Sequence, residues 1–337
     1  MDLKQLETTA RTIVAPGKGI LAADESTGTM GKRLKSVGAE NTEQNRIAFR
    51  GALFTAPGWE QHISGVILYD ETIKQSVDGT LVPKLLASKG VVPGIKVDTG
   101  SKPLALAPNE EVTEGLDGLR ERLIAYHALG ARFAKWRAVI NIGADFPTQR
   151  GIHANAHALA RYAALCQENG IVPIVEPEVI GDGAHTIERC FEVTDAVQDA
   201  VFEQLKAHHV HLPGILLKPN MVVPGYRSGQ RSNAQQVAQL TLDVLRKNVP
   251  ASVPGVVFLS GGLSDEDATE FLDAMNKAQG PKPWALSFSY GRALQHAPLT
   301  TWAGKAENKA KAQAAFMKRA RLNGLAAMGR YDREMEK

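Results

Sequence analysis

Eight short apolar runs, each followed by a segment with helical periodicity, limit the folds open to this chain more than any other feature of its sequence. The runs end about every 30 to 45 residues, which is the repeat of successive strand–helix units. Such alternation predicts a parallel sheet whose strands are joined by right-handed crossovers. The runs that we interpret as strands are Gly19–Ala23, Gly65–Asp70, Gly94–Asp98, Phe133–Arg137, Val172–Glu176, Ile215–Lys218, Val256–Ser260 and Ala285–Ser289.

The segments between these runs carry apolar residues at the spacing of amphipathic helices. One of them opens on Ser264 followed by three acidic residues, a pattern that indicates a helix N-terminus. The helices that we expect are Glu43–Leu53, Leu116–Leu129, Ala154–Glu168, Ile187–Ala207, Ala234–Arg246 and Asp265–Lys277.

Eight strand–helix units favour a closed (β/α)8 barrel of the TIM type, with an open doubly wound sheet as the alternative. No G-x-G-x-x-G follows a strand and no P-loop occurs. The unusual polar residues also follow nearly every strand instead of gathering at one switch point. We therefore expect an α/β fold with a single TIM-barrel domain over residues 1–337. A short N-terminal helix within 1–17 and a C-terminal helix with a short tail at about 305–337 complete it.

Charge and composition exclude several classes of function. The 39 basic and 36 acidic residues leave a formal net charge of +3, so no nucleic-acid partner is expected. No apolar run reaches the roughly 18 residues that a membrane helix needs, and the N-terminus does not read as a signal peptide. The two cysteines, Cys166 and Cys190, make no disulfide framework. We expect a cytoplasmic protein, with a mature plastid form left open.

Charged residues close several of the predicted strands, although barrel strands are buried on both faces and should read as Val, Ile and Leu. Burying an unpaired ion is costly, so these groups should meet one another or a charged ligand. Active sites of such barrels lie at the C-terminal ends of the strands, where this set predicts a site for an anionic substrate. The residues are Asp24, Lys96, Asp98, Lys135, Arg137, Glu176, Glu178 and Lys218.

Lys218 is the sharpest candidate for a nucleophile, because its amine follows the buried run Leu216–Leu217. Burial and a second cation such as Lys135 both favour the neutral amine. A neutral amine attacks a ketone and forms an iminium, which withdraws electrons so that an adjacent carbon–carbon bond can break. Carboxylates such as Glu176, Glu178 and Asp24 then have work as proton shuttles.

Two glycine-containing segments indicate phosphate binding. Leu259-Ser260-Gly261-Gly262 follows the seventh predicted strand, and Ser289-Tyr290-Gly291-Arg292 follows the eighth. Barrels commonly bind phosphate with the loops after these two strands, where glycine backbones, hydroxyls and an arginine supply donors. A second cluster, Lys32-Arg33 after Asp24-Glu25-Ser26-Thr27, either serves another phosphate or is a solvated helix start.

No metal site is predicted. The histidines His208, His209 and His211 cluster just before the sixth strand, at the opposite end of the barrel from the expected site, and no H-E-x-x-H or C-x-x-C motif occurs. The G-x-S-x-G signature of serine hydrolases is also missing.

Taken in order, eight segments resemble the class I fructose-1,6-bisphosphate aldolases, over about Lys18 to Gly329. They include Gly-Ile-Leu-Ala-Ala-Asp-Glu-Ser-Thr-Gly, Phe-Ala-Lys-Trp-Arg, Leu-Leu-Lys-Pro-Asn-Met-Val and Phe-Leu-Ser-Gly-Gly. The segments lie at 19–28, 65–69, 94–98, 133–137, 169–178, 216–222, 258–262 and 284–295.

The resemblance implies a role for each matching residue. Lys218 is similar to the family's Schiff-base lysine, and Glu176 to its main acid/base group. The residues that resemble its assisting groups are Asp24, Lys135 and Glu178. Those that resemble the C1-phosphate site are Ser260, Gly261, Gly291 and Arg292, with Ser289 and Leu259 beside them. Those that resemble contacts to the other phosphate, the substrate or the rim are Lys96, Arg137, Ser26, Thr29, Lys32 and Arg33.

The resemblance also implies an activity: reversible cleavage of fructose 1,6-bisphosphate to dihydroxyacetone phosphate and glyceraldehyde 3-phosphate, in glycolysis, gluconeogenesis or the Calvin cycle. It implies no cofactor and no metal, and a homotetramer that binds sugar bisphosphates and triose phosphates. One departure is the C-terminus, which ends at Lys337 without the tyrosine-ended tail of animal members, so substrate preference stays open. The alternatives are another Schiff-base barrel enzyme such as a transaldolase, or a non-catalytic barrel used as a scaffold.

Overall fold

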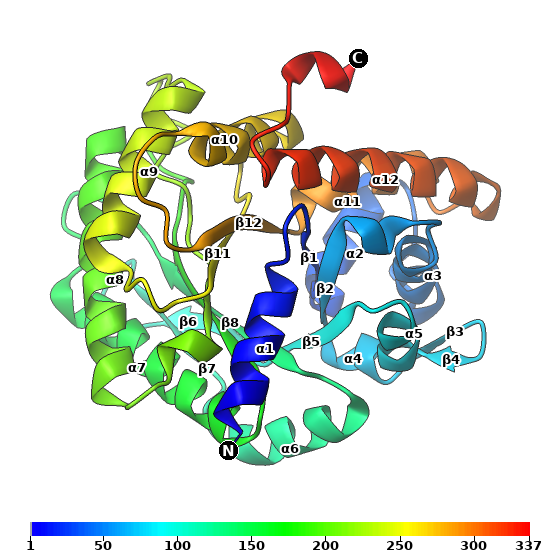
Figure 1. Cartoon of the computed structure of the whole chain (residues 1–337), viewed down its shortest axis with the longest axis horizontal. Coiled ribbons are helices and arrows are strands. Elements are labelled where there is room, and N and C mark those ends of the chain that lie inside the picture. Colours follow the sequence, from blue (N-terminus) through cyan, green and yellow to red (C-terminus); the bar gives the residue numbers. More distant parts are fainter. Residues whose placement is uncertain (1) are drawn as a thin grey trace.

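The computed structural model describes residues 2–337, and its centre is a closed barrel of eight parallel strands (Figure 1). Each strand pairs with the next along the chain, and the first pairs with the last, Leu21 lying opposite Tyr290. The (β/α)8 prediction is confirmed, and the open sheet is wrong. The strands are β1 (Gly19–Ala23), β2 (Ile63–Leu68), β5 (Val92–Lys96), β8 (Phe133–Ile140), β9 (Val172–Val179), β10 (Leu216–Leu217), β11 (Gly255–Phe258) and β12 (Ala285–Tyr290).

The bounds of the longest and the shortest barrel strands differ from the prediction. β8 and β9 run three residues further, because Ala138–Ile140 pair residue by residue with Pro177–Val179. β10 keeps only two residues, so Lys218 stands just beyond it. The predicted ends Asp70 and Asp98 fall outside β2 and β5: Asp70 is the first residue of α4 (Asp70–Ile73), and Asp98 lies in the loop after β5.

The helices form an outer layer around the barrel (Figure 1). Polar side chains cap most of the long ones: Ser264, for example, accepts the amide of Asp267 at 3.0 Å, as its sequence predicts. The barrel helices are α2 (Thr27–Ser36), α3 (Glu43–Phe54), α4 (Asp70–Ile73), α5 (Val82–Ser88), α6 (Leu119–Leu129), α7 (Gln149–Glu168), α8 (Ile187–Ala207), α9 (Ala234–Asn248), α10 (Asp265–Lys277) and α11 (Arg292–Trp302).

A short helix, α1 (Leu3–Ile13), lies across the barrel in Figure 1 and closes its N-terminal end. Its buried Leu6, Ala10 and Ile13 join an inner cluster with strand residues such as Ile20 and Phe133. Removing this apolar surface from water holds α1 in place. The helix lies within the predicted 1–17 segment, of which residue 1 is outside the described part.

The barrel interior is filled, which fixes where a ligand can enter. The ring of Phe133 occupies the space beside Gly94, where a Cβ atom would lie 2.3 Å from the ring. The interior is therefore a packed core and not a channel. A ligand must bind above it, at the C-terminal ends of the strands.

The remaining elements lie outside the barrel. Two small antiparallel sheets pair β3 (Ser76–Val77) with β4 (Thr80–Leu81), and β6 (Gly100–Pro103) with β7 (Glu111–Glu114). Helix α12 (Lys309–Ala326) follows, and a final 3₁₀ turn at Arg333–Glu336 docks back on it, with Arg319 bound to both carboxylate oxygens of Glu336. In residues 2–337 no helix has the length and apolar character needed to cross a membrane.

Candidate active site

A cleft of about 790 Å³ opens at the C-terminal ends of the barrel strands. Residues of β1, β5, β8, β9 and β12 and residues that follow the other strands line it. Of the seventeen residues to which the family resemblance gives a role, sixteen lie on this cleft, which is where the strand-end argument places them. They are Asp24, Ser26, Thr29, Arg33, Lys96, Lys135, Arg137, Glu176, Glu178, Lys218, Leu259, Ser260, Gly261, Ser289, Gly291 and Arg292.

Four of these side chains form a continuous chain of charges at the bottom of the cleft. The Nζ atom of Lys218 lies 3.0 Å from Oε1 of Glu176, and the Nζ atom of Lys135 lies 3.4 Å from the other oxygen, Oε2. Lys135 also lies 2.8 Å from Oδ2 of Asp24. Lys218, Lys135 and Glu176 are each at most 4% exposed. Two lysines and two carboxylates therefore alternate in a buried cluster that balances its own charge.

The cluster fixes the protonation of two of its members, Asp24 and Lys135. Burial alone would raise the pKa of Asp24, but the charges of Lys135, Lys218 and Lys96 outweigh it and lower the pKa to about 2. Burial alone would lower the pKa of Lys135, but Asp24 and Glu176 outweigh it and raise the pKa. Asp24 is thus anionic and Lys135 cationic at neutral pH.

Two further ion pairs flank the cluster. Arg137, on the same face of β8 as Lys135, bonds the carboxylate of Glu178 on β9 through its Nε atom. Lys96 lies 2.6 Å from Oδ1 of Asp98. Asp98 also accepts the backbone amides of Gly100 and Arg137, so it ties the end of β5 to β8.

The loops after β11 and β12 present unpaired donors to the cleft. Gly261 adopts a φ of +52°, which few other residues tolerate. Among residues 2–337 no hydrogen-bond partner is found for its amide. Gly291 immediately precedes α11, and no side chain caps that helix, which leaves the first amides free for an anion. The buried hydroxyl of Ser289 likewise has no partner within the described chain.

The second basic cluster divides between the cleft and the outside. Ser26 caps α2, accepting the amide of Thr29 at 3.2 Å, and both residues line the cleft with Arg33. Lys32 does not: it borders a separate hollow of about 250 Å³ against α11. Arg33 borders both the cleft and this hollow, and the role of Lys32 at the other phosphate or the rim stays a prediction.

Several cleft residues carry no clear signal in the sequence. Glu25 is buried and bonded by Arg33 at 2.6 Å and by Gln295 at 2.7 Å, which holds α2 and α11 against the end of β1. Tyr126 and Asp70 meet at 2.8 Å on the rim. Because these partners are between 8 and 270 residues apart, sequence spacing alone could not pair them.

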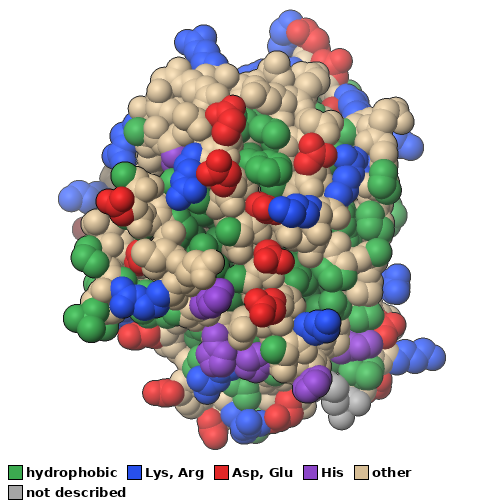
Figure 2. All heavy atoms as spheres, turned by 90° about the vertical axis from the view of Figure 1, so that its left-hand side faces the viewer, with side chains coloured by type: hydrophobic (Ala, Val, Ile, Leu, Met, Phe, Trp, Pro, Cys, Tyr) green, Lys and Arg blue, Asp and Glu red, His purple; other side chains and the backbone are tan. Residues whose placement is uncertain are grey.

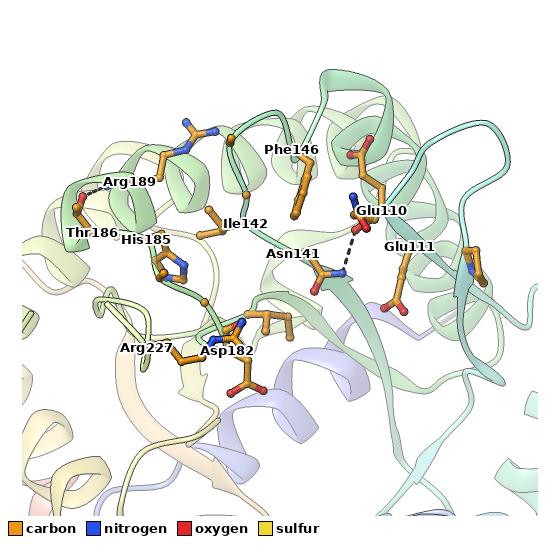
Figure 3. Close-up of a pocket in the computed structure, with 17 residues that line it drawn as sticks. Glu110, Glu111, Asn141, Ile142, Phe146, Asp182, His185, Thr186, Arg189 and Arg227 are labelled. Atoms are coloured by element: carbon orange, nitrogen blue, oxygen red, sulfur yellow. Dashed lines mark hydrogen bonds between the residues drawn. The ribbon is translucent and has the colours of Figure 1, made fainter. Parts of the chain in front are cut away.

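A second cavity, of about 850 Å³, lies outside this cleft (Figure 3). Phe146, Ile142 and His185 line it together with acidic residues such as Glu110 and Glu111. Its lining holds no lysine, so it offers no amine for covalent chemistry. The cavity and the cleft have similar volumes, and the buried lysines and carboxylates of the cleft make it the candidate site.

The histidines stand apart from the cleft. Figure 2 shows histidine side chains gathered on the face that carries α7 and α8. There His157 and His208 lie edge to face with ring centres 5.0 Å apart, and His211 pairs with Glu7 of α1 at 2.8 Å. Within residues 2–337 no group of three or more His, Cys, Asp or Glu side chains is arranged to hold a metal ion.

Comparison with known proteins gives consistent matches. The family model of fructose-bisphosphate aldolase class-I matches residues 5–337. A probable fructose-bisphosphate aldolase class 1 of Xanthomonas campestris is 55% identical over 98% of this chain and 99% of its own length. Cytosolic fructose-bisphosphate aldolase 4 of Arabidopsis thaliana is 54% identical over 97% of this chain and 84% of its own.

The fold agrees with a solved structure. A fructose-bisphosphate aldolase from Plasmodium falciparum, solved in complex with TRAP and a small-molecule inhibitor, superposes with a TM-score of 0.96. It is 49% identical to this chain, and the match covers 98% of this chain and 95% of that one.

Proposed function

Because this chain belongs to the class-I fructose-bisphosphate aldolase family and is therefore a lyase that works through a lysine Schiff base without a metal ion, we propose that Lys218 is its nucleophile. The observation that carries the proposal is the 3.0 Å contact between Nζ of Lys218 and Oε1 of Glu176. No other lysine of the cleft follows so short a strand at the barrel centre. Lys135 is held cationic by Asp24 and Glu176, which leaves Lys218 as the amine that can react.

The reaction begins with attack of the Lys218 amine on the C2 ketone of fructose 1,6-bisphosphate. The carbinolamine loses water after Glu176 protonates its hydroxyl, and an iminium forms between C2 and the lysine nitrogen. Lys135 and Asp24 hold the Glu176 carboxylate where it reaches the nitrogen. Proton transfer by one positioned carboxylate accelerates such a step by about 10²- to 10⁴-fold.

Cleavage then uses the iminium as an electron sink. A carboxylate removes the proton of the C4 hydroxyl, the C3–C4 bond breaks, and its electron pair moves into the enamine. Glyceraldehyde 3-phosphate leaves first. Protonation of the enamine carbon and hydrolysis of the resulting iminium release dihydroxyacetone phosphate and restore the amine. We assign the carboxylate work to Glu176, with Glu178 oriented beside it by Arg137.

The two phosphates bind at opposite sides of the cleft in this proposal. Ser260, Gly261, Gly291 and Arg292 receive the C1 phosphate, supported by the unpartnered Gly261 amide and the uncapped start of α11. The assignments to the other phosphate and the rim are Lys96, Arg137, Ser26, Thr29, Lys32 and Arg33. Sugar phosphates are the substrates of the family, and these cations supply the complementary charge.

We also propose a cytoplasmic homotetramer in which residues 1–337 form one domain. The cytosolic names of the Arabidopsis relatives support the location. The family assignment favours this activity over a transaldolase or a non-catalytic scaffold, and all four members of the charge cluster are in place.

Borohydride reduction in the presence of dihydroxyacetone phosphate, followed by peptide mass spectrometry, tests the nucleophile. The expected result is a reduced adduct on Lys218 and nowhere else. An adduct on Lys135 or Lys96 would move the assignment to that residue. Full cleavage activity without any adduct would overturn the Schiff-base proposal.

A further inference from the structure

Tyr226 reaches the proposed phosphate loop from a different part of the chain. It lies in the segment between β10 and α9, while the loop Ser260–Gly262 follows β11. Its hydroxyl oxygen accepts the backbone amide of Gly262 at 2.8 Å. Because β10 lies between β9 and β11 in the barrel, its loop is placed to join the loops on either side.

The ring of Tyr226 is seated by glycines on both sides. A Cβ atom at Gly262 would lie 2.0 Å from the ring, one at Gly181 2.7 Å from it, and one at Gly261 3.3 Å from the hydroxyl oxygen. Any larger residue at Gly181 or Gly262 would displace the ring. The tyrosine therefore fills the gap between the loops after β9 and β11.

Backbone pairing fixes the tyrosine itself. Tyr226 donates its amide to the carbonyl of Gly181 at 2.9 Å, and Arg227 donates to that of Gly183 at 2.8 Å. The side chain of Arg227 adds a bond to the carbonyl of Asp182, and Figure 3 shows these two residues together at the edge of the second cavity. The segment that carries Tyr226 is thus anchored on the β9 side before its hydroxyl reaches the β11 side.

The contact matters because Gly261 and Gly262 form a peptide with little steric restraint. A glycine–glycine peptide can rotate between several orientations, since neither residue has a side chain to oppose the turn. Bonding the Gly262 amide to Tyr226 fixes the plane of that peptide. The amides of this loop then keep the orientation in which that of Gly261 stays free of protein partners.

We propose that Tyr226 is a positioning residue of the substrate-phosphate site, which holds the loop Ser260–Gly262 through its hydroxyl and ring. The inference rests on the proposed role of that loop in binding phosphate. Tyr226 also borders a hollow of about 270 Å³ together with Ser260, Gly261 and Arg292, next to the main cleft. Its effect is therefore on phosphate affinity and not on the chemistry at Lys218.

The test compares Tyr226→Phe, which keeps the ring and removes only the hydroxyl, with wild type. Loss of one hydrogen bond of ordinary strength corresponds to about a three- to tenfold change in affinity. We expect KM for fructose 1,6-bisphosphate and the inhibition constant of inorganic phosphate to rise by that factor, while kcat changes by less than about twofold. Hydrogen exchange at the Gly262 amide should accelerate in the same variant.

A matched control removes a tyrosine hydroxyl elsewhere. Tyr331→Phe deletes the 3.0 Å bond between that hydroxyl and Glu336, away from the cleft. It should leave KM and phosphate inhibition unchanged. A similar rise in KM in both variants would show a general loss of packing and would overturn the inference.

Arg292→Ala separates this inference from the assignment on which it rests. If inorganic phosphate inhibits Arg292→Ala more weakly than wild type but inhibits Tyr226→Phe as strongly as wild type, the role of Tyr226 alone is overturned. Unchanged inhibition in Arg292→Ala would overturn the phosphate-site assignment, and the inference with it. A weakening in both, with kcat preserved in Tyr226→Phe, is the result that we expect.

Discussion

The amine of Lys218, just beyond β10, and the carboxylate of Glu176, on the neighbouring β9, meet at 3.0 Å at the bottom of the cleft. The carboxylate of Glu176 pairs with two lysines, because its second oxygen faces Lys135 at 3.4 Å. Neither Lys218 nor Glu176 is more than 4% exposed. A change at either residue therefore leaves the other with an altered charge partner in a site shielded from water.

Lys218→Met should abolish cleavage while preserving the fold. The substitution keeps most of the side-chain volume but removes the nucleophile, so kcat should fall by at least about 10³-fold. Steady-state cleavage of fructose 1,6-bisphosphate and borohydride trapping measure the loss. Lys277→Met, which removes an exposed lysine paired with Asp273, serves as the control and should keep full activity. Retention of more than a tenth of the activity in Lys218→Met would contradict the assignment.

Glu176→Gln and Glu178→Gln should differ in severity. Glu176 touches both lysines, so its loss removes proton transfer to and from the reacting nitrogen and should lower kcat by about 10²- to 10⁴-fold. Glu178 bonds Arg137 instead, so Glu178→Gln should lower kcat by about tenfold and raise KM by a larger factor. Equal losses in the two variants would remove the distinction between acid/base and supporting carboxylate.

The sequence alone predicts the barrel and most of the cleft for a common physical reason. Charges such as Lys135 and Glu176 stand out against apolar strands, and in a parallel barrel all strand ends meet on one side, so a list of odd residues already describes a site. Contacts between loops are different. Tyr226 bonds Gly262 across 36 residues, and nothing in the local pattern around Tyr226 indicates that partner.

Spacing along α2 does not decide which of its side chains line the cleft. Thr29 and Arg33, four positions apart, line the cleft, whereas Lys32, three positions after Thr29, borders the hollow against α11. The short length of β10 could not be predicted from the sequence either. The run Ile215–Lys218 is apolar enough for a strand, but only Leu216 and Leu217 pair with β9, and of these only Leu217 also pairs with β11.

Gly94→Ala tests the packed barrel interior. The added methyl group would lie 2.3 Å from the ring of Phe133, so ring or backbone must move, at a cost of about 1–3 kcal/mol in the free energy of unfolding. Urea unfolding followed by circular dichroism measures the change. Gly28→Ala in α2, where no atom lies within 4 Å of the new methyl, is the control and should be neutral or stabilising by up to about 1 kcal/mol.

Chelation should leave catalysis unchanged. The class I family works through a lysine Schiff base and not through a metal ion, so prolonged treatment with EDTA should keep kcat and KM within about twofold of their starting values. The cleavage assay before and after dialysis is the measurement. Inactivation by EDTA that zinc reverses would contradict the mechanism.

Asp24→Asn should reveal a pH-dependent contribution to stability. The pKa of Asp24 lies at about 2 in the folded protein, below its ordinary value of 3.8, chiefly because Lys135 and Lys218 outweigh the effect of burial. A depressed folded pKa adds stability that is fully present above the unfolded pKa and is lost as pH falls through the folded one. The difference of nearly two pKa units corresponds to about 2 kcal/mol in the free energy of unfolding.

The free energy of unfolding of the wild type should therefore exceed that of Asp24→Asn by about that amount at pH 6, and this gap should narrow as the pH falls from about 4 toward 2. Urea unfolding of both proteins at several pH values measures the gap, and a gap that stays constant from pH 6 to pH 3 would show that Asp24 titrates normally and that its pairing with Lys135 contributes nothing to the folded state.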